Sequence, residues 1–193
     1  MAGDLIALFG HPGSGKTTIG EELVKLKAGH RISFAGPLRV ELAKALAGVE
    51  DFDSWAPIMA EMSDPETKDR YRPLQQAWGS FRRYDDANYW TRQVEKAIRL
   101  TLHNDPEKSI IIDDCRFPNE YKMLADQGFV FVLLEPGETT RQLPADVAAH
   151  ESERYWPEFH FDIKLPYVQG PYAQAMTLSA RVANWRREKE RAR

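Results

Sequence analysis

An eight-residue segment near the start of the chain, GHPGSGKT at 10–17, constrains the fold more than any other feature. It has the spacing Gly-x4-Gly-Lys-Thr and follows an apolar run at 5–9 that is typical of a strand buried on both faces of a parallel sheet. After it, Ile19, Leu23 and Leu26 recur at helical spacing. A strand, a glycine-rich turn and a helix in this order let backbone N–H groups surround phosphate oxygens, so the segment predicts a nucleotide phosphate cradle, or P-loop (Walker A motif).

The residue types within this segment suit phosphate chemistry. Gly13 and Gly15 permit dihedrals and close approaches that a Cβ would obstruct. The Lys16 ammonium is expected to reach the β- and γ-phosphates, and the Thr17 hydroxyl to help hold Mg²⁺, which prefers oxygen ligands. The residues predicted to bind ATP are His11, Gly13, Ser14, Gly15, Lys16, Thr17 and Thr18.

Length and composition favour one soluble intracellular domain. The chain has 193 residues, 42% of them hydrophobic, and no apolar run approaches the ~20 residues that cross a bilayer. A secretory signal pattern is absent and Cys115 is the single cysteine, which suits a reducing compartment such as the cytoplasm. A net charge of −3 argues against binding polymeric nucleic acid. We therefore expect no membrane or nucleic-acid partner.

Apolar patterning along the rest of the chain predicts an α/β fold, with a mostly parallel central sheet flanked by helices. Strands are predicted at 30–34, 109–112 and 129–134, and helices at 38–46, 89–102, 119–127 and 172–185. The segment 49–86 is rich in aromatic and charged residues and is interpreted as a helical insertion. The organisation predicted is one domain over 1–193.

Carboxylates and arginines at predicted strand ends are candidates for the chemistry. Asp113 and Asp114 end an apolar strand, where one carboxylate can order Mg²⁺. Strand alternation leaves open which of them does so.

Phosphate binding alone does not define the reaction, because switches, motors and kinases all bind phosphate in such a cradle. An Asn-Lys-x-Asp tetrapeptide for guanine recognition is absent from the sequence, which also lacks regions for a motor's lever. These observations favour a small-molecule kinase.

Several segments, in order along the chain, add a family resemblance. Residues 110–120, IIIDDCRFPNE, resemble the Asp-x-Arg-Phe-Pro-Asn-Glu segment of phage-type deoxynucleoside monophosphate kinases, which belong to the P-loop nucleotide kinase superfamily. The resemblance extends to 34–39, 74–79, 88–90 and 150–153, and so spans most of the chain. It implies a P-loop kinase fold with a helical acceptor-binding insertion at 49–86 and a lid at 135–160.

The resemblance implies transfer of the γ-phosphoryl of ATP, with Mg²⁺, to a deoxynucleoside 5′-monophosphate. Lys16, Arg116 and Asp114 would be the catalytic residues, with Thr17, Asp113 and Asp114 as the metal candidates. Acceptor binding is assigned to Arg39, Gln75, Gln76, Trp78, Arg82, Arg83, Asp114, Arg116 and Glu120. The lid is assigned Arg141, His150, Glu151, Ser152 and Glu153.

Alternatives remain open on the sequence alone. The acceptor could instead be a ribonucleoside monophosphate or dephospho-coenzyme A, or the chain could be a P-loop ATPase switch without an acceptor. A phage origin, and with it a host cytoplasm, follows only from the resemblance. The bases accepted are left open, and a homodimer is kept as an alternative to a monomer.

Overall fold

The protein has an α/β fold built on a five-stranded, all-parallel sheet of order β2-β3-β1-β4-β5. The computed structural model describes residues 3–11, 13–64, 66–135, 155, 158–168 and 170–192. Within these ranges the strands are β1 (Leu5–Phe9), β2 (His30–Arg31), β3 (Ile110–Ile112), β4 (Val130–Leu134) and β5 (Ile163–Leu165). The helices are α1 (Lys16–Lys27), α2 (Ala35–Ala47), α3 (Phe52–Glu61), α4 (Lys68–Asp85), α5 (Tyr89–Asn104), α6 (Pro118–Asp126) and α8 (Pro171–Arg191).

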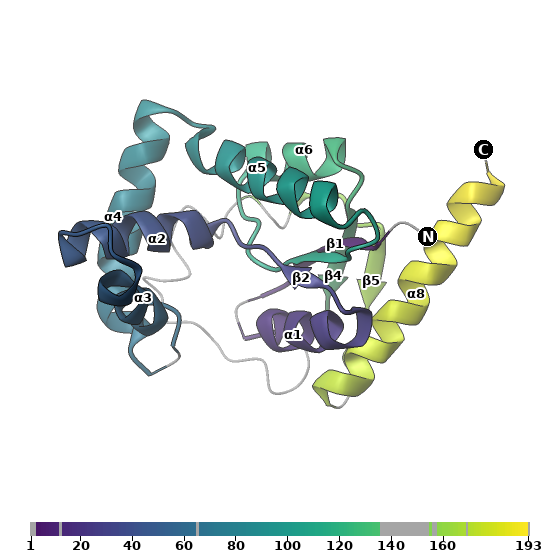
Figure 1. Cartoon of the computed structure of the whole chain (residues 1–193). Helices are drawn as coiled ribbons and strands as arrows, with labels where there is room; N and C mark the ends of the chain where they lie inside the picture. Colours follow the sequence, from purple (N-terminus) through teal and green to yellow (C-terminus); the bar gives the residue numbers. More distant parts are fainter. Residues whose placement is uncertain are drawn as a thin grey trace. The chain divides into compact units, whose positions relative to one another are not determined.

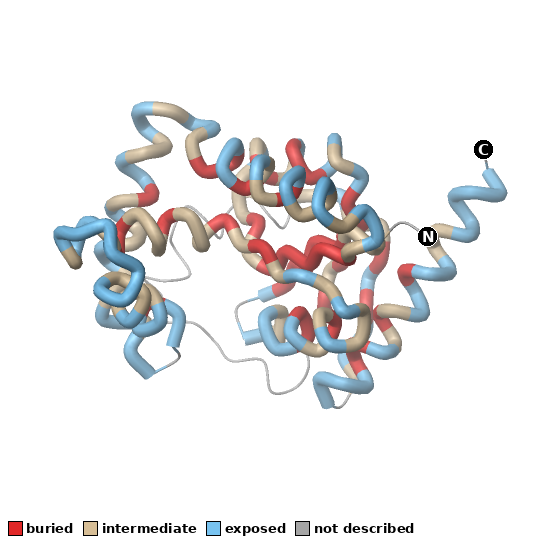
Figure 2. The backbone as a smooth tube through the Cα atoms, in the orientation of Figure 1, coloured by how far each residue is buried: buried red, intermediate tan, exposed pale blue. Residues whose placement is uncertain are grey.

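The central strand β1 lies between β3 and β4, and Ile6 is paired with Ile111 on one side and Val130 on the other. All three side chains are almost fully buried, and Figure 2 shows the strands as a continuous buried layer. A parallel strand covered on both faces needs apolar side chains in both directions, which explains the uninterrupted runs at 5–9 and 110–112. The positions predicted for these strands are confirmed.

The chain divides into two compact units, 1–32 with 98–193, and 33–97. The first, the sheet unit, carries α1 and α8 on one face of the sheet and α6 on the other (Figure 1). Its core on the first face joins strand residues such as Leu8 and Val132 to Leu23 of α1 and Leu178 of α8. On the other face Phe9 and Phe131 pack with Tyr121 of α6.

The second, the helical unit, contains α2, α3, α4 and the start of α5. Its core is small and centres on Leu42, Ala43 and Met62. Partly buried side chains surround these residues: Trp55, Ile58, Met59, Tyr71 and Trp78. The helices predicted for 49–86 are present as α3 and α4, and the unit as a whole extends on both sides of that range.

The largest differences from the sequence predictions concern β5, β2, α2 and α8. Strand β5 was not predicted, because three residues give too short an apolar pattern to recognise. Strand β2 ends at Arg31 rather than 34, and its two residues His30 and Arg31 pair with β3. Helix α2 begins at Ala35, because Pro37 lies in its first turn, where a proline removes no helical hydrogen bond. Helix α8 continues to Arg191.

Among the described residues, no helix is both long and apolar enough to cross a bilayer.

Candidate phosphate-binding site

The predicted cradle lies at the carboxyl end of β1, in the turn that leads into α1. Gly10, Gly13 and Gly15 all have positive φ, at 148°, 82° and 81°. A Cβ on Gly10 would lie 2.9 Å from the carbonyl oxygen of Leu134, so the turn can follow its path only with glycine there. The Ser14 N–H donates to the His11 carbonyl at 3.0 Å and tightens the turn. The structure thus forms a compact glycine turn at a helix N-terminus, as the spacing predicts.

Lys16 begins α1 and its side chain folds back over the turn. Its Nζ donates to the Gly10 carbonyl at 2.7 Å and to the His11 carbonyl at 3.0 Å. The ammonium is therefore held against the turn that would surround a phosphate group. Thr17 and Thr18 follow in the first helical turn and are exposed. A positive side chain and the partial positive charge of the helix N-terminus act in the same place, which favours an anion.

The strand order places this turn at a switch point of the sheet. From β1 the chain passes through α1 to β2 on one side, and from β3 it passes through α6 to β4 on the other. Because α1 and α6 cover opposite faces (Figure 1), their first turns diverge at the carboxyl edge of the strands. Ligands of open parallel sheets bind in the crevice at such a point. The topology therefore supports the cradle as a ligand site.

The two candidate metal carboxylates follow β3, the strand next to β1, and their surroundings differ. Asp113 is 4% exposed, and its two oxygens accept hydrogen bonds from Nε and Nη2 of Arg31, each at 3.0 Å. Asp114 is half-buried. The guanidinium of Arg31 thus engages both oxygens of Asp113, and Asp114 next to it is the second candidate to meet a metal. Arg31 was not among the predicted site residues, because only the pairing of β2 with β3 brings it to Asp113.

Arg116 lies in the turn between β3 and α6, and Glu120 holds the backbone of that turn. The Glu120 Oε2 accepts from the backbone N–H of Arg116 at 2.8 Å and from that of Phe117 at 3.1 Å. Glu120 is only 4% exposed. These bonds satisfy N–H groups at the start of α6, which is the role of a capping carboxylate. Glu120, predicted to bind the acceptor, thus has a structural task in positioning Arg116.

The other predicted acceptor residues all belong to the helical unit. Arg39 on α2 donates from Nε to Gln75 Oε1 on α4 at 3.4 Å, and Gln75 donates to the Met62 carbonyl at 3.4 Å. Arg82 forms an ion pair with Glu41, and its guanidinium lies 5.6 Å from the ring centroid of Trp78. The two remaining residues, Gln76 and Arg83, are half-buried on α4. Helices α2 and α4 thus carry cations, amides and an indole ring among the predicted acceptor residues.

A pocket of about 150 Å³ adjoins the cradle, and the sequence did not reveal it. Its lining combines the cradle with the segment after β5 and the start of α8: Gly13, Ser14, Gly15, Thr18, Ile19, Tyr167, Val168, Gly170, Pro171 and Gln174. Gln174 fixes the far wall, because it accepts from the Val168 N–H at 2.8 Å and donates to the Pro166 carbonyl at 3.3 Å. Cavities of about this size accommodate one aromatic ring. The one sequence feature that pointed to this wall of the pocket was the dipeptide Gly170-Pro171, which is typical of a helix start.

Oxygen donors suited to Mg²⁺ are present on both strands that border the crevice. Thr17 provides a hydroxyl after β1, and Asp114 a carboxylate after β3. Within the described ranges no cluster of three or more His, Cys, Asp or Glu side chains forms a protein-only metal site. Magnesium usually takes one or two protein oxygens and completes its shell with water and substrate phosphates, so the donors fit this ion.

The predicted lid residues lie outside the described residues: Arg141, His150, Glu151, Ser152 and Glu153. At the end of the predicted lid range, Glu158, Phe159 and His160 are described. The Phe159 ring lies 4.5 Å from that of Tyr121, whose hydroxyl donates to the His160 carbonyl at 3.0 Å. These contacts attach Phe159 and His160 to α6.

A scan against protein-family models and a search of curated proteins each found no match to this sequence.

Proposed function

We propose that the protein is a P-loop kinase that transfers the γ-phosphoryl group of ATP to a deoxynucleoside 5′-monophosphate. The observation that carries the proposal is the cradle with a ring-sized pocket beside it, formed by Ser14, Gly15, Pro171 and Gln174 among others. A phosphate site adjoining a partly apolar pocket fits a nucleotide, with its phosphates on the turn and its base in the pocket. The resemblance of residues 110–120 supplies the reaction class and the acceptor.

The residues after β3 support a transfer reaction. Phosphoryl transfer depends on positioning and on neutralising negative charge, because the acceptor phosphate is already a competent nucleophile. Lys16 would contact the β- and γ-phosphates, and Arg116 would face the transferred or the acceptor phosphate. Thr17 and Asp114 would hold Mg²⁺, which would supply further neutralisation of the phosphate charge. Glu120 keeps the backbone of Arg116 fixed during these events.

The helical unit supports a small planar acceptor with an anionic group. Arg39, Gln75 and Arg82 lie on its α2 and α4 helices, together with the Trp78 indole. Arginine recognises phosphate, amides pair with base edges and an indole can stack on a base. In the proposed P-loop kinase fold this unit is the acceptor-binding insertion, and residues 135–160 are the lid.

The direct test is an assay of the purified chain with ATP, Mg²⁺ and each of dAMP, dCMP, dGMP and dTMP. Ribonucleoside monophosphates, dephospho-coenzyme A and a reaction without acceptor run in parallel, and the products are identified by chromatography and mass. The proposal expects acceptor-dependent formation of a deoxynucleoside diphosphate. Only hydrolysis of ATP, without transfer, would replace it with the ATPase switch. Faster transfer to a ribonucleotide or to dephospho-coenzyme A would change the acceptor class.

A matched pair of lysine variants excludes a contaminating kinase. Lys16→Ala removes the ammonium held over the cradle, so we expect activity to fall by more than about 100-fold. Lys25→Ala removes an exposed lysine from the same helix, and the ion pair of Lys25 with Glu22 lies at the surface. We expect this control to retain full activity, and equal losses in both variants would argue against a role for the cradle.

A further inference from the structure

The pair of Arg31 and Asp113 leaves hydrogen-bonding capacity of a buried carboxylate unused. Nε and Nη2 of Arg31 each donate to a different oxygen of Asp113. A carboxylate has about four acceptor positions, so this bidentate contact occupies one position on each oxygen and leaves the others. Within the described part of the chain, no further hydrogen bond to the Asp113 side chain is formed, although it is 1% exposed. Such a buried acceptor is suited to a donor that a ligand brings.

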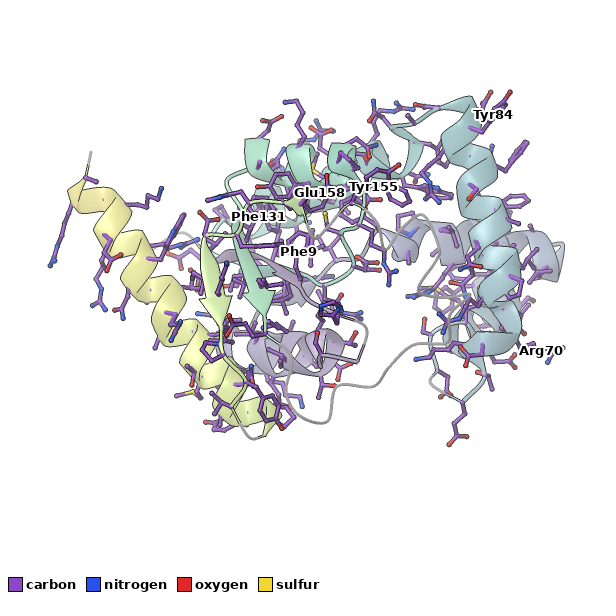
Figure 3. The ribbon with its side chains drawn as sticks, turned by 180° about the vertical axis from the view of Figure 1, so that it is seen from behind. Phe9, Arg70, Tyr84, Phe131, Tyr155 and Glu158 are labelled. Carbon is purple, nitrogen blue, oxygen red and sulfur yellow. The ribbon has the colours of Figure 1, made fainter. Side chains whose placement is uncertain are left out.

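The carboxylate lies on the face of the sheet that α1 covers. Arg31 of β2 is in register with Ile111 of β3, and paired residues of parallel strands point to the same face. Ile111 belongs to the core beneath α1 and α8, so Arg31 reaches Asp113 from that face. Phe9 and Phe131 pack together on the opposite face, as Figure 3 shows. At this edge the sheet is therefore polar on the α1 side and aromatic on the other.

The first turn of α1 places Thr17 at the same level of the sheet. A Cβ on Gly20 would lie 3.5 Å from Cγ2 of Ile111, so this side of α1 faces β3. Thr17 precedes Gly20 by three residues and lies on the same side of the helix, closer to the cradle. Asp113 follows Ile111 by two residues, in the same direction. The exposed Thr17 hydroxyl and the Asp113 carboxylate are thus directed to the same region beside the cradle.

Negative charge around Arg31 exceeds what this side chain neutralises. Burial acts to lower the pKa of the guanidinium, but Asp113, and after it Asp114 and Glu21, raise the pKa above its usual value. One guanidinium does not neutralise three carboxylates. The surplus negative charge favours a divalent cation in this region.

We propose that Arg31 is a positioning residue for Mg²⁺, which it serves by holding Asp113 with its unused acceptor positions towards the water shell of the ion. The inference rests on the nucleotide-binding part of the proposed function and does not require the transfer reaction. Mg²⁺ loses water reluctantly, and carboxylates that act on a metal through its bound groups are held by partners of their own. Asp113 thus supplements the direct donors Thr17 and Asp114.

The first experiment measures how strongly Mg²⁺ promotes binding of a non-hydrolysable ATP analogue. Calorimetric titration gives the dissociation constant of the analogue in Mg²⁺ and in EDTA, and the ratio of the two is the metal effect. Arg31→Lys keeps a cation beside Asp113 but loses the two parallel bonds. We expect the metal effect to fall by about 10-fold, with affinity in EDTA changed less than about twofold. Arg72→Lys is the matched control, because Arg72 bonds Asp69 at the surface of α4.

A double variant tests whether Arg31 acts through Asp113. Asp113→Asn keeps the size of the side chain and removes its charge, so it should reduce the metal effect by itself. If Arg31 acts through this carboxylate, adding Arg31→Lys to Asp113→Asn causes no further loss. Binding of Mn²⁺ in the presence of the analogue, followed by electron paramagnetic resonance, gives the same comparison from the metal's side. Circular dichroism confirms that the variants fold, and additive losses overturn the proposal.

The outcomes separate this inference from the proposed function. An unchanged metal effect in Arg31→Lys overturns the inference and leaves the kinase proposal in place. Equal losses of affinity in Mg²⁺ and in EDTA also overturn it, because Arg31 would then support the cradle and not the metal. If the original chain binds no analogue in either condition, both proposals are wrong.

Discussion

The two carboxylate oxygens of Asp113 are both engaged by the guanidinium of Arg31, at 3.0 Å from Nε and 3.0 Å from Nη2. The side chain of Asp113 is 1% exposed and that of Arg31 34%. The pair joins the edge strand β2 to the end of β3, directly beside the proposed metal carboxylate. It therefore contributes both to the stability of the edge and to the position of Asp114.

Removing this arginine should destabilise the fold. Arg31→Ala leaves the buried carboxylate of Asp113 without its partner, and we expect the free energy of unfolding to fall by about 2 kcal/mol. The measurement is urea unfolding followed by circular dichroism. Lys122→Ala is the control, because its ion pair with Asp126 is exposed and should contribute less than about 0.5 kcal/mol. Equal midpoints for Arg31→Ala and the original chain would show that the pair adds no stability.

The path of the cradle should depend on Gly10 more than on other glycines with positive φ. Gly10→Ala would place a Cβ 2.9 Å from the Leu134 carbonyl oxygen, so strand β4 or the turn must shift. We expect a loss of about 2 to 3 kcal/mol in unfolding free energy and weaker ATP binding. Gly128→Ala has φ at 81° but meets nothing within 4 Å, so it should lose only about 1 kcal/mol and keep ATP affinity. Thermal unfolding and ATP titration compare the two.

Arg116 should affect the acceptor more than the donor. Arg116→Ala removes the guanidinium but keeps the backbone N–H that Glu120 accepts, so the turn should survive. We expect kcat/KM for the deoxynucleoside monophosphate to fall by about 10- to 100-fold, with ATP affinity changed less than about threefold. Steady-state kinetics with each substrate varied in turn gives this comparison. Unchanged acceptor kinetics would remove Arg116 from the site.

The pocket wall fixed by Gln174 should control donor affinity. Gln174→Ala removes the hydrogen bonds to the Val168 N–H and the Pro166 carbonyl, so the segment after β5 loses its anchor. We expect ATP to bind about 5- to 10-fold more weakly, with little change in kcat. Thr177→Ala on the same helix loses only an exposed bond to Ala173 and should bind ATP normally. Calorimetric titration measures both, and equal affinities would separate the pocket from the donor site.

Cys115 should be inert in the native protein. Burial, followed by the nearby carboxylates of Glu120 and Asp114, raises the pKa of its thiol well above the usual range. The folded state therefore keeps the proton at pH values where the unfolded thiol loses it, so this group's contribution to stability declines as pH rises above about 8.5. We expect iodoacetamide to modify the native thiol at pH 9 at least about 100-fold more slowly than the thiol in denaturant. Mass spectrometry measures the rates.

Some strands and helices could be predicted from the sequence and others could not, depending on how deeply each element is buried. Strands β1, β3 and β4 are almost entirely buried, so each needs an apolar run that is visible locally. Helix α4 was visible through its aromatic and charged composition. The short strand β5 has one exposed residue of three, Lys164, and carries no such pattern. It forms because β4 offers a free edge, and that edge exists only in the assembled sheet.

The same distinction applies to the candidate site. The sequence by itself determined the cradle, because glycines, Lys16 and Thr17 are adjacent in the chain and their spacing directly dictates the local backbone. Only the tertiary structure decided that Arg31 engages Asp113, 82 residues away, and that the segment after β5 and the start of α8 wall the pocket beside Ser14. These contacts depend on strand order. Strand order follows from burying the sheet on both faces, a property of the whole sheet unit that no local spacing encodes.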